Sequence, residues 1–303
     1  MLQKIRENLE RVVLGKPEAV QLALVALLAK GHLLIEDVPG VGKTLLATAL
    51  SRSLGCTFER IQCTSDLLPS DVLGVSIFNQ VSRQFEYKQG PIFANLVLVD
   101  EINRTSPKTQ SALLQAMSEW IVSVDGTTYA LPQPFMVLAT QNPLEQHGTF
   151  SLPDSQLDRF MSRMHMGYPG WAAERQLLKG GDAFQQLKGM APVCQVQDVL
   201  DLQAEVGRVQ TAEPIFDYIM RIVEATRTVP ELKCGVSPRG ALALLAAVKA
   251  RAMVEGRRYA IPDDVKALAV PVLAHRVMFA NRLPVPEQER YFSTLLTTIS
   301  VPL

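Results

Sequence analysis

Residues 37–44 read Asp-Val-Pro-Gly-Val-Gly-Lys-Thr, and this stretch decides the fold. It follows the apolar run 33–35 and precedes a helical pattern over 45–50, which is the strand, loop and helix context of a phosphate-binding loop. Gly40 and Gly42 allow backbone angles closed to other residues, so that successive N–H groups can turn toward phosphate oxygens. The start of the following helix adds partial positive charge at the same place.

Lys43 and Thr44 supply the chemistry that a nucleoside triphosphate needs in such a loop. Lys43 is expected to reach the β- and γ-phosphates, and the Thr44 hydroxyl to ligate Mg²⁺. The full pattern G-x-x-x-x-G-K-[ST] has glycine at its first position, where this chain has Asp37. Because the Pro-Gly-Val-Gly-Lys-Thr core is intact, the sequence still predicts a site for a nucleoside triphosphate.

The composition is ordinary for a globular protein of one large domain or two smaller ones: 303 residues, 48% hydrophobic and 20% charged. Lys plus Arg and Asp plus Glu number 30 each, so no overall field draws the chain to nucleic acid or to an anionic membrane. The first residues mix charges, unlike a secretory signal, and no apolar run approaches the ~20 residues of a bilayer span. The four cysteines lack Cys-x-x-Cys spacing, which favours reduced thiols in a cytoplasmic protein.

Two regions of different character meet near residue 168. Region 1–168 alternates short apolar runs with helical patterns, which predicts an α/β fold with a parallel sheet covered by helices on both faces. Region 169–303 shows helical periodicity alone, which predicts an all-helical domain. The expected strands are 32–36, 57–62, 96–100, 135–141 and 162–166. The expected helices are 18–29, 43–53, 108–119, 172–178, 196–208, 215–227, 238–255, 262–276 and 287–299.

Two hairpins are expected as insertions in the α/β region. Residues 74–90 carry alternating β-type residues around a polar turn, between the second and third strands. Residues 121–131 have Asp125-Gly126 at their centre, which predicts a tight turn. Short hairpins also occur as inert surface connections, so the pattern alone leaves their role open.

Polar residues follow two of the buried strands. The apolar run 95–99 ends in Asp100 and Glu101, whose side chains point to opposite sides because side chains alternate along a strand. We assign Asp100 to Mg²⁺ and Glu101 to polarising the attacking water as general base. Asn142 ends the next apolar strand, so it should emerge at the same sheet edge, where its amide can orient the water or contact the γ-phosphate.

These motifs together resemble those of an AAA+ ATPase, and more narrowly of the MoxR family. The resemblance runs from about residue 13 to the last helices, and several motifs in the same order make it specific. The motifs that carry it are Pro-Gly-Val-Gly-Lys-Thr (39–44), Gln-Cys-Thr-Ser-Asp-Leu-Leu-Pro (62–69), Val-Asp-Glu-Ile-Asn-Arg (99–104), Ala-Thr-Gln-Asn-Pro (139–143), Phe-Ser-Leu-Pro (150–153), Leu-Asp-Arg-Phe (157–160) and Ser-Pro-Arg (237–239).

The resemblance implies further site residues and a helical lid behind the sheet. Arg159 would be an arginine finger, supplied to the γ-phosphate of a neighbouring subunit, with Arg163 as the alternative finger. Arg239 would be the sensor 2 arginine that links phosphate state to lid position. Relatives with an inserted hairpin place the lid differently, so the resemblance leaves open whether Arg239 serves its own subunit or the next. The nucleotide would contact Val13 and Leu14 at the adenine, and Pro39, Val41 and Leu45 beside the glycines and lysine of the loop.

The resemblance also implies a hexameric ring that binds ATP and Mg²⁺ and remodels or matures a protein client, often with a partner that carries a von Willebrand factor A domain. A nucleic-acid motor is disfavoured, because 121–131 lacks lysine and arginine and the first hairpin offers only Arg83 and Lys88. A small-molecule phosphotransferase is disfavoured because no second substrate motif is present. A chelatase-type motor subunit, which drives metal insertion in another protein, differs only by its partner and stays open.

Overall fold

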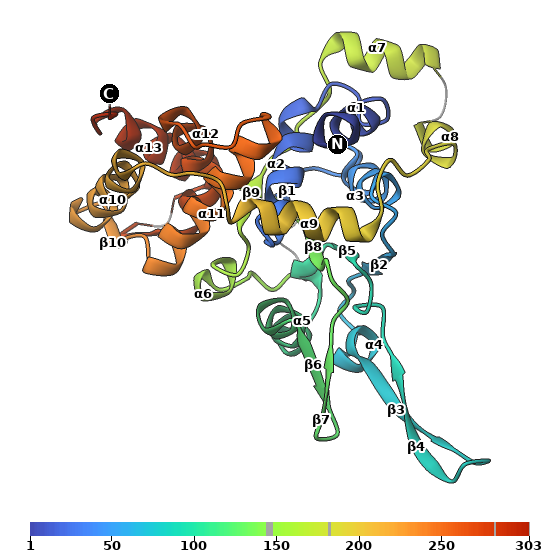
Figure 1. Cartoon of the computed structure of the whole chain (residues 1–303). Helices are drawn as coiled ribbons and strands as arrows, with labels where there is room; N and C mark the ends of the chain where they lie inside the picture. The colour runs from blue at the N-terminus through green and yellow to red at the C-terminus, as the bar shows by residue number, and fades with distance from the viewer. Residues whose placement is uncertain (144–147, 181–182, 282, 303) are drawn as a thin grey trace.

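The computed structural model describes residues 1–143, 148–180, 183–281 and 283–302. It consists of an α/β core, two hairpins that project from the core side by side, and a mainly helical part that follows in the chain (Figure 1). All four cysteines are free thiols. Within the described ranges, we find no helix that combines the length and the apolar character of a membrane span.

The core is a parallel sheet of five strands in the order β2-β5-β8-β1-β9. Alternate residues of each strand pack on opposite faces: Leu33 and Ile35 of β1 lie in one hydrophobic cluster and Leu34 in the other. Helices cover both faces, as the unbroken apolar runs predict. The five predicted strands are confirmed, with bounds β1 Leu33–Glu36, β2 Phe58–Gln62, β5 Leu96–Asp100, β8 Met136–Gln141 and β9 Ser162–Met164.

The helices of the core include all three that were expected. These are α2 (Pro17–Leu28), α3 (Lys43–Ser53) and α5 (Pro107–Glu119). Helix α1 and three short helices were not among those predicted; the short ones, of three to five residues, carry too little periodicity to detect. They are α1 (Leu2–Glu10), α4 (Pro69–Leu73), η1 (Ile102–Arg104) and α6 (Asp154–Leu157).

Both predicted hairpins are present. The first pairs β3 (Gly74–Asn79) with β4 (Gln84–Gln89), and the second pairs β6 (Ile121–Val124) with β7 (Thr127–Ala130). In the second, the predicted turn residues Asp125 and Gly126 both have positive φ, 51° and 77°. Two successive positive φ values define the type I′ turn, whose twist matches that of the flanking strands.

The C-terminal part contains the predicted helices but is not all helical. Strands β10 (Leu232–Cys234) and β11 (Met278–Phe279) form a small antiparallel ribbon, so that prediction was wrong in this detail. Strands of two or three residues are too short to show alternation in the sequence. Helix α11 packs on α2 and α12 on β9, which docks this part on the β9 edge of the sheet. The helices are α7 (Trp171–Gly180), α8 (Ala183–Lys188), α9 (Val196–Val206), α10 (Glu213–Thr228), α11 (Pro238–Val254), α12 (Pro262–Leu273), η2 (Ala274–Arg276) and α13 (Val285–Thr297).

Candidate nucleotide-binding site

A cavity of about 450 Å³ lies where β1 and β5 end. The structure brings together most of the predicted site residues in its wall: Val13, Leu14, Pro39, Gly40, Val41, Gly42, Lys43, Thr44, Leu45, Asp100 and Glu101. Ligands of open α/β sheets bind at the carboxyl ends of the strands, and this cavity has that position. The lining also includes residues that sequence reasoning missed, namely Val12, Lys16, Arg60, Pro169 and Leu177.

The phosphate-binding loop has the backbone conformation that its glycines permit. Gly40 and Gly42 have φ of 87° and 97°, and Gly42 is the residue before the first turn of α3. The Nζ of Lys43 donates to the carbonyl oxygen of Asp37 at 2.7 Å. Burial lowers the pKa of Lys43, whereas the carboxylates of Asp100, Asp37 and Glu101 oppose that shift. The hydrogen bond to Asp37 therefore holds the lysine beside the loop, in the wall of the cavity.

Asp37, which stands where the common pattern has glycine, is buried, and both of its carboxylate oxygens accept hydrogen bonds. Its carboxylate accepts from the backbone N–H groups of Val38 (2.8 Å), Met166 (2.7 Å) and Gly167 (2.5 Å). A glycine at this position would leave the N–H groups of Met166 and Gly167 without these acceptors. The aspartate therefore has a structural role in this loop, and its presence does not indicate a defective phosphate-binding motif.

Thr140 positions both carboxylates at the end of β5. Its buried hydroxyl donates to Oδ1 of Asp100 at 2.6 Å and accepts from the backbone N–H of Glu101 at 2.8 Å. Thr140 lies on β8, next to β5 in the sheet. The sequence motif Ala-Thr-Gln-Asn-Pro contains this residue, but its role depends on a neighbouring strand and was not predicted.

The residues at this cavity fit a magnesium ion. Thr44 and Asp100 offer a hydroxyl and a carboxylate oxygen in the same cavity, and Mg²⁺ prefers such hard oxygen ligands, with one or two from the protein and the rest from phosphate and water. Oδ2 of Asp100 accepts from a guanidinium N–H of Arg60 at 2.6 Å, so a bound cation competes with Arg60 for this oxygen.

Glu101 adopts a backbone conformation uncommon for a non-glycine residue. Its φ of 58° lies in the left-handed region, which costs on the order of 1–3 kcal/mol and is found mainly at functional sites. Its carboxylate pairs with Nε of Arg104 at 3.0 Å and accepts from the Gln62 side chain at 3.3 Å. The two neighbouring carboxylates therefore have separate partners: Arg60 and Thr140 for Asp100, and Arg104 and Gln62 for Glu101.

Helix α7 closes the side of the cavity expected to hold the base. Leu177 of α7 lines the cavity together with Val13 and Leu14. Gly15 has φ of 69°, and a Cβ there would lie 2.6 Å from Cβ of Ala173, also on α7. The glycine therefore lets α7 approach the loop that carries Val13 and Leu14.

Four other predicted residues do not line this cavity: Arg159, Arg239, Asn142 and Arg163. Arg159 donates to the carbonyl of Leu114 at 3.0 Å and to the Ser118 hydroxyl, both on α5 of the same chain. Arg239 lies near Asp158, with Nε 3.9 Å from its carboxylate. Asn142 is buried just after β8.

Arg163, the alternative finger, is buried at the edge of the sheet. Its guanidinium faces Glu36 at 3.8 Å and Glu289 of α13 at 3.5 Å. A residue that is buried between carboxylates of its own chain is poorly placed to reach another subunit, which favours Arg159.

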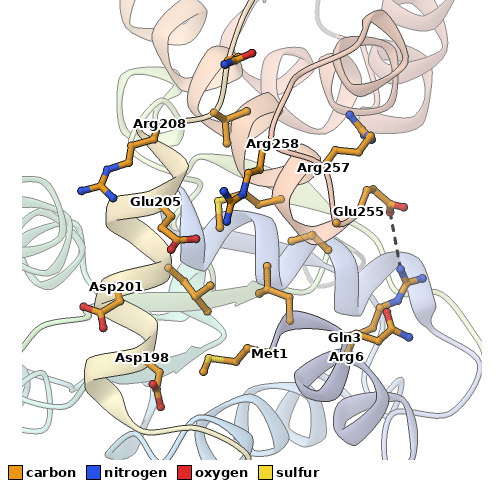
Figure 2. A pocket seen from close by; sticks show the side chains of 17 residues that line it. Met1, Gln3, Arg6, Asp198, Asp201, Glu205, Arg208, Glu255, Arg257 and Arg258 are labelled. Atoms are coloured by element: carbon orange, nitrogen blue, oxygen red, sulfur yellow. Dashed lines mark ion pairs between the residues drawn. The ribbon is translucent and has the colours of Figure 1, made fainter.

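A second cavity, of about 930 Å³, lies apart from these residues between α1, α9 and the turn after α11 (Figure 2). Asp198, Asp201 and Glu205 line it from α9, and an ion pair of 3.8 Å joins Arg6 to Glu255 on another wall. Its lining contains none of the predicted site residues.

The glycine-rich loop after β1 and the two adjacent acidic residues at the end of β5 define a P-loop nucleoside triphosphatase with a C-terminal lid. Comparisons with known proteins agree. Residues 32–162 match the model of the ATPase family associated with various cellular activities (AAA), and residues 224–295 match that of the AAA lid domain.

Relatives cover nearly the whole chain. The uncharacterized protein YeaC of Bacillus subtilis is 51% identical over 92% of this chain and 87% of its own. Chaperone MoxR1 of Mycobacterium tuberculosis is 38% identical over 99% of this chain and 82% of its own. A crystal structure from Cytophaga hutchinsonii, provisionally described as an ATPase, superposes with a TM-score of 0.89 at 36% identity and covers 99% of this chain and 94% of that one. The chain belongs to the MoxR family of AAA+ ATPases.

Proposed function

We propose that the chain is a Mg²⁺-dependent ATPase that works as a ring, in the simplest case a hexamer, and remodels or matures a protein client. One observation carries this: the phosphate-binding loop and both carboxylates line one cavity, whereas Arg159 and Arg239 lie outside it. We assign Arg159 as a finger that acts in trans on the site of a neighbouring subunit, and Arg239 as the sensor 2 arginine of its own site or of the next subunit's.

Each side chain then has one task. Lys43 and the N-terminus of α3 hold the phosphates, and Thr44 and Asp100 hold Mg²⁺, which neutralises phosphate charge when bound. Glu101 accepts a proton from the attacking water. Asn142 follows β8, outside the cavity wall, and is proposed to orient this water from the neighbouring edge of the sheet.

The exposed side chains of the first hairpin support the proposal of a protein client. Val81 at the tip of the first hairpin is 95% exposed and Phe85 is 74% exposed. Exposed apolar side chains are suited to contact another polypeptide, and a hairpin pair with so few cations is poorly suited to bind phosphate backbones. The name of the relative Chaperone MoxR1 points the same way. A partner with a von Willebrand factor A domain fits this proposal, and a chelatase-type role would differ only in the partner.

The test is the ATPase rate against protein concentration, with mass measured by light scattering with and without ATP. A specific activity that rises as a six-subunit mass appears is expected. Lys43→Ala should abolish nucleotide binding, and Glu101→Gln should bind nucleotide without turnover. A concentration-independent rate from a monomer would refute the shared site, and near-normal hydrolysis by Glu101→Gln would refute the general base.

A further inference from the structure

The side chain of Asp37 links the phosphate-binding loop to the segment between β9 and α7. This connecting segment, residues 165–170, has no regular secondary structure. Oδ2 of Asp37 accepts from the N–H groups of Met166 and Gly167, and Oδ1 accepts from that of Val38. Asp37 is only 8% exposed, so these three bonds offset the cost of burying its charge.

Lys16 holds the same segment through its carbonyl groups. Its ammonium donates to the carbonyl oxygens of Met166 (2.5 Å), Gly167 (2.8 Å) and Tyr168 (2.5 Å). Because an ammonium has three N–H donors, Lys16 uses all of them on the connecting segment. The Asp37 carboxylate therefore binds the N–H groups of this segment, and the Lys16 ammonium binds its carbonyl groups.

The main chain of Asp37 is also linked to the phosphate-binding lysine. Nζ of Lys43 donates to the Asp37 carbonyl oxygen at 2.7 Å. A bound triphosphate competes for this ammonium, because charge-assisted hydrogen bonds to phosphate are stronger than those to a neutral carbonyl. A displacement of the Lys43 ammonium therefore acts on the main chain of Asp37, and the side chain of Asp37 transmits it to the connecting segment.

Arg239, the residue expected to link phosphate to the lid, does not line the cavity of its own chain. A link within one subunit must therefore use other residues. We infer that two positioning residues act on the connecting segment, so that nucleotide occupancy sets the position of α7: Asp37 ties the segment to the phosphate-binding loop, and Lys16 holds it at the start of α2. This inference rests on the proposed function, since it takes the bound phosphates to be those of ATP.

The test uses three variants of the full chain and one matched control. Asp37→Asn removes the charge, Asp37→Gly restores the glycine of the common loop pattern, and Lys16→Met removes the three donors. Asp217→Asn, at an exposed position on α10, is the control. For each protein we would measure the affinity for a non-hydrolysable ATP analogue, kcat and KM, and amide hydrogen exchange of Met166 and Gly167 with and without the analogue.

In the wild type and the control, exchange of the two amides should change when the analogue binds. In all three variants the amides should exchange about tenfold faster and no longer respond to the analogue. In the two Asp37 variants the analogue should still bind, within about threefold, and kcat should fall about tenfold at unchanged KM. Should one variant fail to fold, the other two carry the test. Variants whose amides respond as in the wild type would overturn the inference alone. Loss of analogue binding in Asp37→Gly would also overturn it, because Asp37 would then act on the nucleotide. A wild type without ATPase activity would refute the proposed function as well.

Discussion

Tyr87 of the first hairpin stacks on Tyr129 of the second, with ring centroids 4.2 Å apart and ring planes at 25°. The Tyr87 hydroxyl also donates to the carbonyl of Leu73 at the base of its own hairpin. The two hairpins, which project together from the core (Figure 1), are therefore fastened to each other by this contact. Val81 at the tip of the first hairpin remains exposed. A displacement of one hairpin is therefore transmitted to the other through this ring contact.

We predict that Tyr129→Ala loosens the first hairpin although the substitution lies in the second. An aromatic stack is worth about 0.5–1.5 kcal/mol, so amides of β3 and β4 should exchange roughly two- to tenfold faster. Tyr129→Phe keeps the ring and serves as the control. Equal exchange of β3 and β4 in the two variants would contradict the prediction.

Gly15 is predicted to be required for the cavity wall. Gly15→Ala adds a Cβ that would lie 2.6 Å from the Cβ of Ala173 and also strains φ, so α7 should shift outward and ATP affinity should fall about tenfold. Gly256→Ala has a similar φ of 75° but no neighbour within 4 Å, so it separates strain from the clash. Affinity is measured by titration calorimetry. The double variant Gly15→Ala, Ala173→Gly should regain part of the loss; no recovery would place the effect in the backbone of residue 15.

The sequence predicted most of the structural features that depend only on residues close together in the chain. The five core strands are apolar runs that can be recognised in the local sequence. The phosphate-binding loop and the Asp125-Gly126 turn are short patterns, each typical of one backbone conformation. All were predicted with nearly correct bounds. The lid was predicted as a class, but its ribbon of β10 and β11 is too short to leave a periodic signal.

The features that were missed depend on contacts between distant parts of the chain. In the sequence alone, Asp37 is only a departure from a pattern. Its role as an acceptor depends on Met166, which is 129 positions away. Thr140 bridges Asp100 and Glu101 only once β8 lies beside β5. No local pattern encodes such pairs, since the register of the sheet creates them.

Arg159 is predicted to act on the site of another subunit. Its guanidinium is held by the carbonyl of Leu114 near the end of α5, outside the cavity of its own chain. Arg159→Ala should lower kcat by about 10³-fold or more, the usual value of an arginine finger. Mixing it with Glu101→Gln subunits should restore part of the activity, because an intact finger then meets an intact base at some interfaces. The rate is measured across mixing ratios, and no recovery at any ratio would contradict action in trans.

The final prediction concerns an ion pair between the connecting segment after β9 and α13. Nε2 of His165 lies 3.4 Å from the carboxylate of Glu289, and the other ring nitrogen contacts the carbonyl of Glu36. The hydrogen bond to Glu289 raises the pKa of His165 above its ordinary 6.5. The pKa of Glu289 is lowered from 4.5 by His165 and Arg163, against the effect of its burial.

The sign of the pH dependence follows from these shifts. The contribution of His165 is complete below pH 6.5 and is lost as pH rises through its higher folded pKa. That of Glu289 is complete above pH 4.5 and is lost as pH falls through its lower folded pKa. The pair is therefore strongest between these limits and weakens toward alkaline pH.

His165→Gln should remove this dependence. Burial lowers the pKa of His32 to about 4 and that of His275 well below its ordinary value, so those two rings destabilise the fold as the medium becomes acidic. They are common to both proteins, and the difference between wild type and variant isolates His165. The midpoint of urea unfolding, measured from about pH 5.5 to about pH 8.5, should favour the wild type at acid pH and converge with the variant at alkaline pH. A difference that stays constant or grows with pH would show that His165 is neutral in the folded protein and that its contact with Glu289 is not an ion pair.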